Sequence, residues 1–144
     1  NNPYSRRIMT NIYVHQDLHE MNLYPCAYSM TFNVTGNKLN AILNQRSNDI
    51  LTANNWNVVQ YAVLVHMIAQ VSGLEAGELV HVIADAHIYD RHIPLVKELI
   101  KRQTYDAPVF RMNPDVKDFY EFTVDDFELE DYKYGPQIKI PVAG

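Results

Sequence analysis

A two-residue turn between two alternating apolar segments constrains the fold of this chain more than any other feature. The segment "AYSMTFNV" (residues 27–34) places apolar side chains at every second position, with small or polar ones between them. After Gly36-Asn37, a second alternating segment begins. The apolar positions of the two segments are Tyr28, Met30, Phe32, Val34, Leu39, Ala41 and Leu43. A glycine-asparagine pair between two such segments predicts a β-hairpin.

Counting outward from the turn predicts which residues face each other across the hairpin. The expected pairs are Thr35–Lys38, Val34–Leu39, Phe32–Ala41, Met30–Leu43, Tyr28–Gln45 and Cys26–Ser47. Opposed residues lie about 4.5–5.5 Å apart, so the hairpin brings Cys26 towards Gln45, Arg46 and Ser47. A bulge, or a break at Pro25, would shift this register.

The remaining segments predict an α+β (α/β layered) fold, a mixed β-sheet packed with a long central helix. Strands are expected over residues 6–14 and 78–89 and in the closing segment 136–144, with a turn or helical link over 15–21. A helix is expected from Asn55, as its cap, to Gly73, just after its end. A second helix is expected over 90–103 with Pro94 in its first turn, and Thr123 is expected to cap a further turn.

Length and composition indicate one compact domain of ordinary globular character. The chain has 144 residues, of which 47% are hydrophobic and 20% charged. Its net charge of −5 argues against non-specific nucleic-acid binding, and no apolar run approaches the roughly 18 residues of a membrane span. A single cysteine cannot form an internal disulfide, which predicts a reducing, cytoplasmic location. The first residue is Asn1, not Met, which predicts a fragment or a processed chain.

Cys26, the lone cysteine, has two interpretations. Cysteine is often a small buried hydrophobe, and that is the simpler one. Pro25 stiffens the backbone just before it, however, and the hairpin register brings the guanidinium of Arg46 near. A cation favours the thiolate, which is the nucleophilic form, so Cys26 is also a candidate nucleophile.

Other polar residues could bind an anion and a sugar. In "NQRSND" (residues 44–49), Arg46 and Ser47 could bind a phosphate, or the segment could be a solvated strand end. Arg6 and Arg7 form a second basic pair, which in an acidic protein is usually surface charge. His87 and Tyr89 would share a face of a strand and could both donate to a sugar hydroxyl. The histidines lack zinc spacing, and the chain has no Gly-x-Ser-x-Gly elbow and no glycine-rich nucleotide loop, so no metal is expected.

Taken together, these segments resemble the thymidylate synthase family. The matching pieces are "YSRRI", "MNLYPCAY", "NQRSNDILTANNWNVVQYAVL", "ADAHIYDRHI" and "PQIKIPVAG", which occur in the family's order along the whole chain. The family's catalytic segment has Pro-Cys at its centre, as Pro25-Cys26 does here. Five pieces in order are far more specific than any one of them.

The resemblance implies a reaction and a role for each matching residue. Cys26 would add to C6 of dUMP, which would make C5 nucleophilic towards the methylene group of 5,10-methylenetetrahydrofolate, the cosubstrate. The products would be dTMP and dihydrofolate. The implied substrate-binding residues are Gln45, Arg46 and Ser47, the last two for the phosphate, Asn57 for the uracil edge, and His87 and Tyr89 for the 3′-hydroxyl.

The resemblance further implies folate contacts and a homodimer. Asp49 would contact the pterin of the folate, and the C-terminal residues, ending at Gly144, would close over it. Arg6 and Arg7 would reach the phosphate in the partner subunit's site. No nucleic acid and no membrane is implied as a partner.

The chain also departs from the family pattern. Ala27 stands where the family usually has histidine, and Ala53 and Asn55 replace a usual glycine and proline. Residues 1–144 match only the C-terminal portion of the family's domain, and the N-terminal half, with a general-acid glutamate and another phosphate-binding arginine, is absent. Two alternatives stay open: a dUMP or dCMP hydroxymethylase of the same superfamily, and a noncatalytic fragment or dimerisation module.

Overall fold

The computed structural model describes residues 2–141 of a chain that divides into two compact units, Asn1–His87 and Ile88–Gly144. The first unit holds β1 (Met9–Asn11), the 3-10 helix η1 (Leu18–Glu20), β2 (Ala27–Thr35), β3 (Lys38–Gln45), β4 (Asn48–Asp49), α1 (Asn54–Val71), β5 (Glu75–Ile83) and β6 (Ala86–His87). The second holds the 3-10 helix η2 (Asp90–His92), α2 (Ile93–Leu99), β7 (Val109–Met112), the 3-10 helices η3 (Phe119–Glu121) and η4 (Val124–Asp126), and β8 (Phe127–Glu130). Within residues 2–141, no helix is long and apolar enough to cross a membrane.

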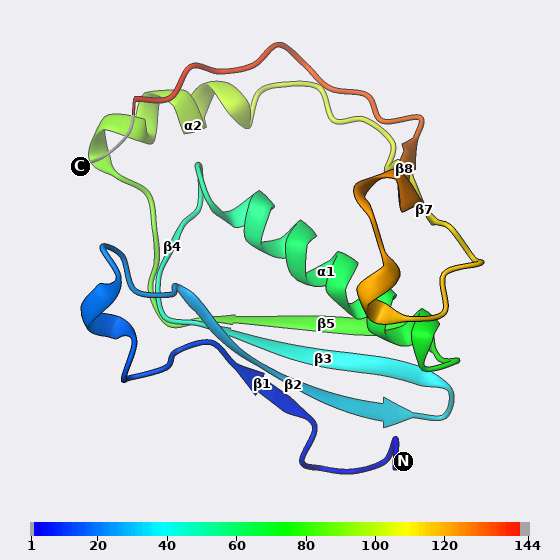
Figure 1. Ribbon diagram of the computed structural model, residues 1–144. Helices are drawn as coiled ribbons and strands as arrows, with labels where there is room; N and C mark the ends of the chain where they lie inside the picture. Colours follow the sequence, from blue (N-terminus) through cyan, green and yellow to red (C-terminus); the bar gives the residue numbers. More distant parts are fainter. Residues whose placement is uncertain (1, 142–144) are drawn as a thin grey trace. The chain divides into compact units, whose positions relative to one another are not determined.

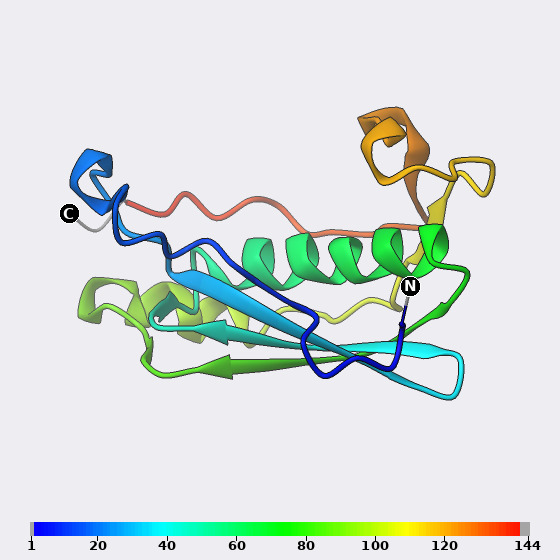
Figure 2. The same ribbon diagram turned by 60° about the horizontal axis from the view of Figure 1, so that its bottom comes forward.

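A mixed sheet is the framework of the first unit. Its strands lie in the order β1-β2-β3-β5, in which β2 is antiparallel to both β1 and β3, and β5 is parallel to β3. Parallel neighbours need a crossover connection. Helix α1 supplies it and lies across one face of the sheet (Figure 1, Figure 2). The predicted mixed sheet packed with a long helix is therefore confirmed.

The alternation along the hairpin explains which face of the sheet α1 covers. The buried side chains of β2 and β3 form one cluster with Val65 and Ala69 of α1. The strand residues of this cluster are Ala27, Met30, Phe32, Leu39, Ala41 and Leu43. Each of the larger side chains contributes roughly 1.5–3 kcal/mol when it is fully buried, so this face determines the register of the hairpin.

The predicted hairpin is confirmed, and its register differs from the prediction only at its open end. The pairs from Thr35–Lys38 to Met30–Leu43 form as expected. A bulge between Ala27 and Ser29 then shifts the register, so that Ala27 pairs with Gln45 in place of Tyr28. An extra residue in one strand reverses the alternation of side chains beyond it. As a result Ala27, which is 6% exposed, joins the core.

Helix α1 begins earlier than predicted and ends where predicted. The expected cap, Asn55, lies inside the first turn, and Ala53 takes the cap position. The reason is that the chain already turns before Asn55, since Ala53 N–H donates to the carbonyl of Asp49 and Asn57 N–H to that of Ala53. Gly73 has φ +68°, the left-handed conformation that glycine adopts after a helix end.

A second bulge interrupts the pairing of β3 with β5. Ala76 pairs with Leu39, but Leu79 pairs with Ala41, so β5 contains one residue more than β3 over this stretch. Ala76 and Leu79 both pack against the core, which is possible only because the extra residue reverses the alternation along β5.

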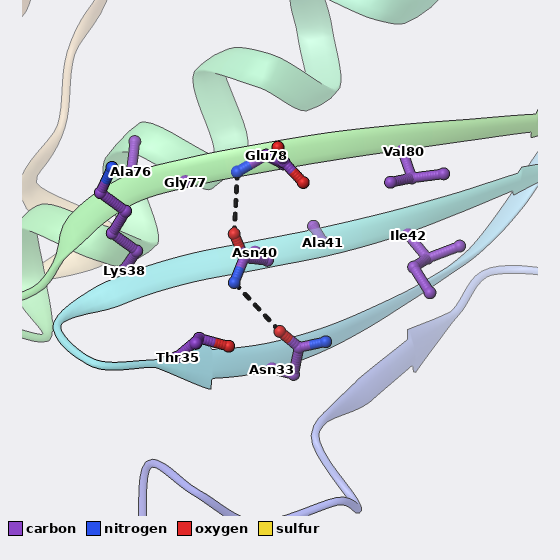
Figure 3. Close-up of a pocket in the computed structure, with 10 residues that line it drawn as sticks. All are labelled: Asn33, Thr35, Lys38, Asn40, Ala41, Ile42, Ala76, Gly77, Glu78 and Val80. Atoms are coloured by element: carbon purple, nitrogen blue, oxygen red, sulfur yellow. Dashed lines mark hydrogen bonds between the residues drawn. The ribbon is translucent and has the colours of Figure 1, made fainter.

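The side chain of Asn40 fills this bulge. Its Oδ1 accepts a hydrogen bond from Glu78 N–H at 2.9 Å, and its Nδ2 donates to Asn33 Oδ1 at 3.2 Å (Figure 3). A Cβ atom on Gly77 would lie 2.3 Å from Asn40 Oδ1 and 2.9 Å from the carbonyl oxygen of Leu39. The bulge therefore requires glycine at position 77.

Three predicted strands are shorter than expected or absent. Residues 6–14 give only the three residues of β1, after a turn that contains Arg6 and Arg7. The strand predicted over 78–89 ends at Ile83, because the chain changes partners and forms β6 beside β4. The described closing residues, 136–141, form no strand. Instead, the carbonyls of Pro136 and Pro141 accept hydrogen bonds from Arg102 and His92.

The second unit is built from short elements. Pro94 lies in the first turn of α2, as predicted. The predicted Thr123 cap is confirmed, with Asp126 as its partner in a capping box. Strands β7 and β8 are antiparallel, and Phe127 stacks on Phe110 and Phe122 with ring centroids 6.2 and 5.5 Å apart.

We predict that Gly77→Ala destabilises the protein by about 1–3 kcal/mol, the usual cost of forcing an atom into filled space. The added methyl group would meet the Asn40 side chain and a backbone carbonyl that cannot move without breaking the sheet. Urea denaturation, followed by circular dichroism, measures the change.

The matched control is Gly135→Ala. The nearest atom to its added Cβ would be Arg102 Nη1 at 3.7 Å, an ordinary contact, so its effect should stay within about 0.5 kcal/mol. Equal denaturation midpoints for Gly77→Ala and the unchanged protein would contradict the requirement for glycine.

Candidate functional site

The candidate site lies at one edge of the sheet, where the parallel strands β3 and β5 both end. Parallel strands present their carboxyl ends at the same edge, which is where open sheets usually bind ligands. Backbone hydrogen bonds hold the two continuing segments together, from Ala84 N–H to Gln45 O and from Asn48 N–H to Asp85 O, both at 2.9 Å. Strands β4 and β6 extend this pairing and place Asp49 opposite His87.

Cys26 lies beside Arg46 at this edge. The bulge at Ala27 shifts the predicted Cys26–Ser47 pairing by one residue, so Arg46 N–H donates to the carbonyl of Cys26 at 2.8 Å. The Arg46 side chain then donates to the carbonyls of Pro25 (3.0 Å) and Tyr24 (2.7 Å), and its Nη2 lies 3.8 Å from Cys26 Sγ. The half-buried thiol is therefore held beside a fixed guanidinium.

A buried amide links the end of β3 to α1 and β5. Gln45, which is 2% exposed, donates from Nε2 to the carbonyl of Ser47 at 2.8 Å and to Asn57 Oδ1 at 3.0 Å. Its Oε1 lies 2.8 Å from His81 Nε2. Burial lowers the pKa of His81 below its ordinary value, so the ring is neutral near pH 7. The arrangement forms a continuous polar chain from β5 to the first turns of the helix.

The predicted folate and sugar residues of the first unit lie at the same edge. The Asp49 carboxylate accepts hydrogen bonds from the N–H groups of Leu51 and Thr52 and from the Thr52 hydroxyl, the last at 2.5 Å. It therefore shapes the turn into α1. His87 Nδ1 lies 3.3 Å from Asp85 Oδ2, and its side chain is about 29% exposed.

Two of the other predicted residues, Arg6 and Arg7, lie in the first unit but outside the strands that form this edge. Arg6 and Arg7 are exposed in the turn before β1. Tyr89 belongs to the second unit, where its ring packs edge-on against His92 at 5.7 Å. Gly144 lies outside the described residues. The prediction that His87 and Tyr89 share one strand is wrong, because β6 ends at His87.

Two features of the site were missed from the sequence. The first is His81, which shares the parity of Leu79 and Ile83 along β5. The second is a cluster of aromatic rings around Tyr13, which contacts His15, Tyr24 and Tyr28 at centroid distances of 5.5–6.3 Å. A cavity of about 340 Å³ lies beside it. Its lining residues are Asn11, Tyr13, His15, Tyr28 and Arg46.

A pair of asparagines joins β4 to the start of α1. Asn48, which is 1% exposed, donates from Nδ2 to Asn54 Oδ1 at 3.1 Å. Within the described part of the chain, Asn48 Oδ1 has no hydrogen-bond partner. A buried carbonyl oxygen without a donor is destabilising, so this pair is a weak point of the site's scaffold.

The fold and the site define an α+β protein whose polar site lies at the carboxyl edge of a parallel strand pair. The thymidylate synthase family model matches residues 1–144. The chain therefore belongs to the thymidylate synthase family.

Individual relatives agree in sequence and in structure. The chain is 46% identical over 143 residues to a thymidylate synthase of Bacillus subtilis subsp. natto and 47% identical over 143 residues to that of Bacillus phage phi3T, in each case covering 99% of this chain and 51% of the relative. The structure matches the thermostable thymidylate synthase A of Bacillus subtilis with a TM-score of 0.94 at 45% identity, covering 99% of this chain and 51% of that one. The chain spans about half the length of the curated relatives it matches.

We predict that Asn54→Leu lowers the free energy of unfolding by about 1–3 kcal/mol, because it leaves both polar atoms of the buried Asn48 side chain without partners. Adding Asn48→Val should recover this loss, since replacing both members of a buried polar pair with apolar groups is close to neutral. Denaturation of the two single variants and the double variant measures the coupling. Additive effects of the two substitutions would contradict the pairing.

Proposed function

We propose that the full-length protein is a thymidylate synthase that converts dUMP to dTMP with 5,10-methylenetetrahydrofolate. The observation that carries this proposal is the thiol of Cys26 held 3.8 Å from the guanidinium of Arg46, the residue that directly follows Gln45 at the end of β3. A nucleophile, an anion-binding group and an amide chain thus occupy one edge of the sheet. We also propose a cytoplasmic location, in keeping with one unpaired cysteine.

The thiol of Cys26 supplies the first chemical step. Its Sγ forms a bond to C6 of the pyrimidine, and the electron pair of the C5–C6 double bond moves to C5 and O4. Covalent addition divides a difficult alkylation at C5 into easier steps. The folate supplies the one-carbon unit and the hydride. C5 loses its proton after the one-carbon unit has bonded there, and the Cys26 thiolate leaves C6 as the C5–C6 double bond forms again.

Arg46 and Ser47 are suited to hold the phosphate of the nucleotide. The guanidinium is fixed by two hydrogen bonds, from Nε to the carbonyl of Pro25 and from Nη2 to the carbonyl of Tyr24. Among the described residues, its Nη1 group makes no hydrogen bond, and guanidinium is the preferred partner of phosphate. Gln45 holds the backbone of the same segment in place, because its Nε2 donates a hydrogen bond to the Ser47 carbonyl.

Asn57, Asp49 and His87 are suited to bind the uracil base, the pterin of the folate and the sugar hydroxyl, respectively. The Asn57 amide offers one donor and one acceptor, which matches the N3–H and O4 of uracil. Asp49 is a carboxylate acceptor for pterin N–H groups, and His87 faces it across β4 and β6 as a donor for the sugar hydroxyl. Tyr89 is proposed to join His87 at that hydroxyl, and Gly144 to close over the folate.

We further propose that the outer face of the sheet joins two copies in a homodimer. This face is turned away from α1 and carries the exposed apolar side chains of Ile42 and Val80 (Figure 3). Val82, two residues further along β5, is exposed as well. Contiguous apolar surface of this kind is typical of protein interfaces. We propose that Arg6 and Arg7, which are exposed before the edge strand β1, reach the phosphate site of the partner subunit.

We predict a covalent adduct when the full-length protein is incubated with 5-fluoro-dUMP and 5,10-methylenetetrahydrofolate. Fluorine at C5 cannot leave as a proton does, so the complex should stop with Cys26 bound to C6. Mass spectrometry of the intact protein and of its peptides measures the adduct. Its absence at Cys26 would refute the proposed mechanism.

The matched variant is Cys26→Ser. It should abolish the adduct and the turnover while dUMP binding, measured by calorimetry, changes by less than about threefold. Lost binding would instead assign Cys26 to packing. Product analysis by chromatography separates dTMP from a hydroxymethyl product, and an inactive protein would favour a noncatalytic role.

For the homodimer, we predict that Val80→Asp gives monomers in analytical ultracentrifugation at micromolar concentration, because a charge would lie in the apolar interface. The control is Val109→Asp, a change at a similarly exposed valine of the second unit (47% against 49%), which should leave the dimer intact. A Val80→Asp protein that stays dimeric would rule out this face as the interface.

A further inference from the structure

The orientation of every amide in the Gln45 chain is determined by one backbone group. The carbonyl of Ser47 can only accept a hydrogen bond, and it lies 2.8 Å from Gln45 Nε2. The same Nε2 group donates to Asn57 Oδ1. Gln45 Oε1 therefore faces β5, where it accepts from His81, and His81 must carry a proton on Nε2.

This polar chain determines which edge of a base Asn57 can read. A carboxamide is nearly symmetric in shape, and rotation by half a turn exchanges its donor and its acceptor. Uracil offers a donor at N3 and an acceptor at O4, whereas cytosine offers an acceptor at N3 and a donor at N4. If the Asn57 amide could turn, it would fit either base. Because Gln45 holds its Oδ1 in one orientation, it fits only one base, uracil.

His81 reaches Gln45 only because of the bulge at Asn40 and Gly77. Without the extra residue in β5, the side chains of Glu78, Val80 and Val82 would continue the core face from Ala76, and His81 would point outward. The observed pairing instead puts Leu79, His81 and Ile83 on the face that α1 covers. The imidazole is neutral there, so it donates a hydrogen bond without leaving a charge behind the site.

We propose that His81 is a positioning residue that holds the amide of Gln45, and through it that of Asn57, in the orientation that accepts uracil nucleotides and rejects cytosine nucleotides. The inference rests on the proposed function, in which Asn57 reads the base. It adds a residue of β5 that touches neither substrate nor cosubstrate, and it assigns the bulge a role in specificity.

The test compares His81→Phe, which keeps a ring but removes the donor, with His81→Gln, which restores an N–H donor at similar reach. In the full-length protein, His81→Phe should lower kcat/KM for dUMP about tenfold, the effect of one unsatisfied buried amide. It should also lower the preference for dUMP over dCMP in the same assay. His81→Gln should recover most of the kcat/KM for dUMP and most of the preference for dUMP over dCMP.

Two results would overturn the proposal. One is a His81→Phe protein whose activity and base preference stay within twofold of the unchanged protein. The other is a His81→Gln protein no better than His81→Phe at equal denaturation midpoints, which would make the role of His81 merely structural.

A second measurement keeps this test separate from the proposed function. Long-range ¹H–¹⁵N spectra of the ligand-free protein, labelled at histidine, report which ring nitrogen of His81 carries the proton. An Nε2–H tautomer supports the chain even if the protein forms no adduct and turns over no dUMP, in which case the proposed function alone fails. An Nδ1–H tautomer overturns the chain whatever the activity.

Discussion

The parallel pairing of β3 with β5 is the constraint on which the rest of the first unit depends. It requires a crossover, and α1 both supplies that crossover and covers the apolar face of the hairpin. It also brings the carboxyl ends of two strands to one edge, so the polar residues after Gln45 and after Ile83 meet there. An antiparallel β5 would separate these two segments by the length of the strand. The site therefore follows from strand direction before any side chain is considered.

Two bulges then determine which side chains face the site. The bulge at Ala27 changes the partner of Cys26 from Ser47 to Arg46, and the bulge at Asn40 turns His81 towards Gln45. Each inserts one residue, and in a strand one residue is enough to exchange the two faces. In both strands, apolar side chains still pack into the core around the bulge. The bulges therefore change which side chains face the site without loss of apolar burial.

The sequence predicts the parts of this structure that depend on local patterns. The hairpin, its turn and most of its register follow from alternation around Gly36-Asn37, and Gly73, Pro94 and Thr123 have the expected positions at helix ends. The bulges could not be predicted in the same way, because Asn40 holds an N–H group 38 residues further along the chain. The same limit hid His81, whose face depends on that bulge. The predicted Asn55 cap was wrong because the Asp49 carbonyl accepts a hydrogen bond from Ala53 N–H, so the chain turns into the helix earlier. The predicted long strand to Tyr89 was wrong because β4 pairs with residues 86–87, which end as the separate strand β6.

The bulge at Ala27 also explains how this chain accommodates its departure from the family pattern. Ala27 pairs with Gln45 and is buried on the face that α1 covers, so a histidine at position 27 would lie against the same amide chain. In this chain the imidazole that contacts Gln45 is that of His81, which reaches it from β5. Gln45 is consequently satisfied at both Nε2 and Oε1 although it is almost fully buried, in contrast to Asn48, whose Oδ1 has no donor within residues 2–141. Because an amide with every bond made has one stable orientation, the departure at Ala27 leaves the polar chain behind Asn57 ordered.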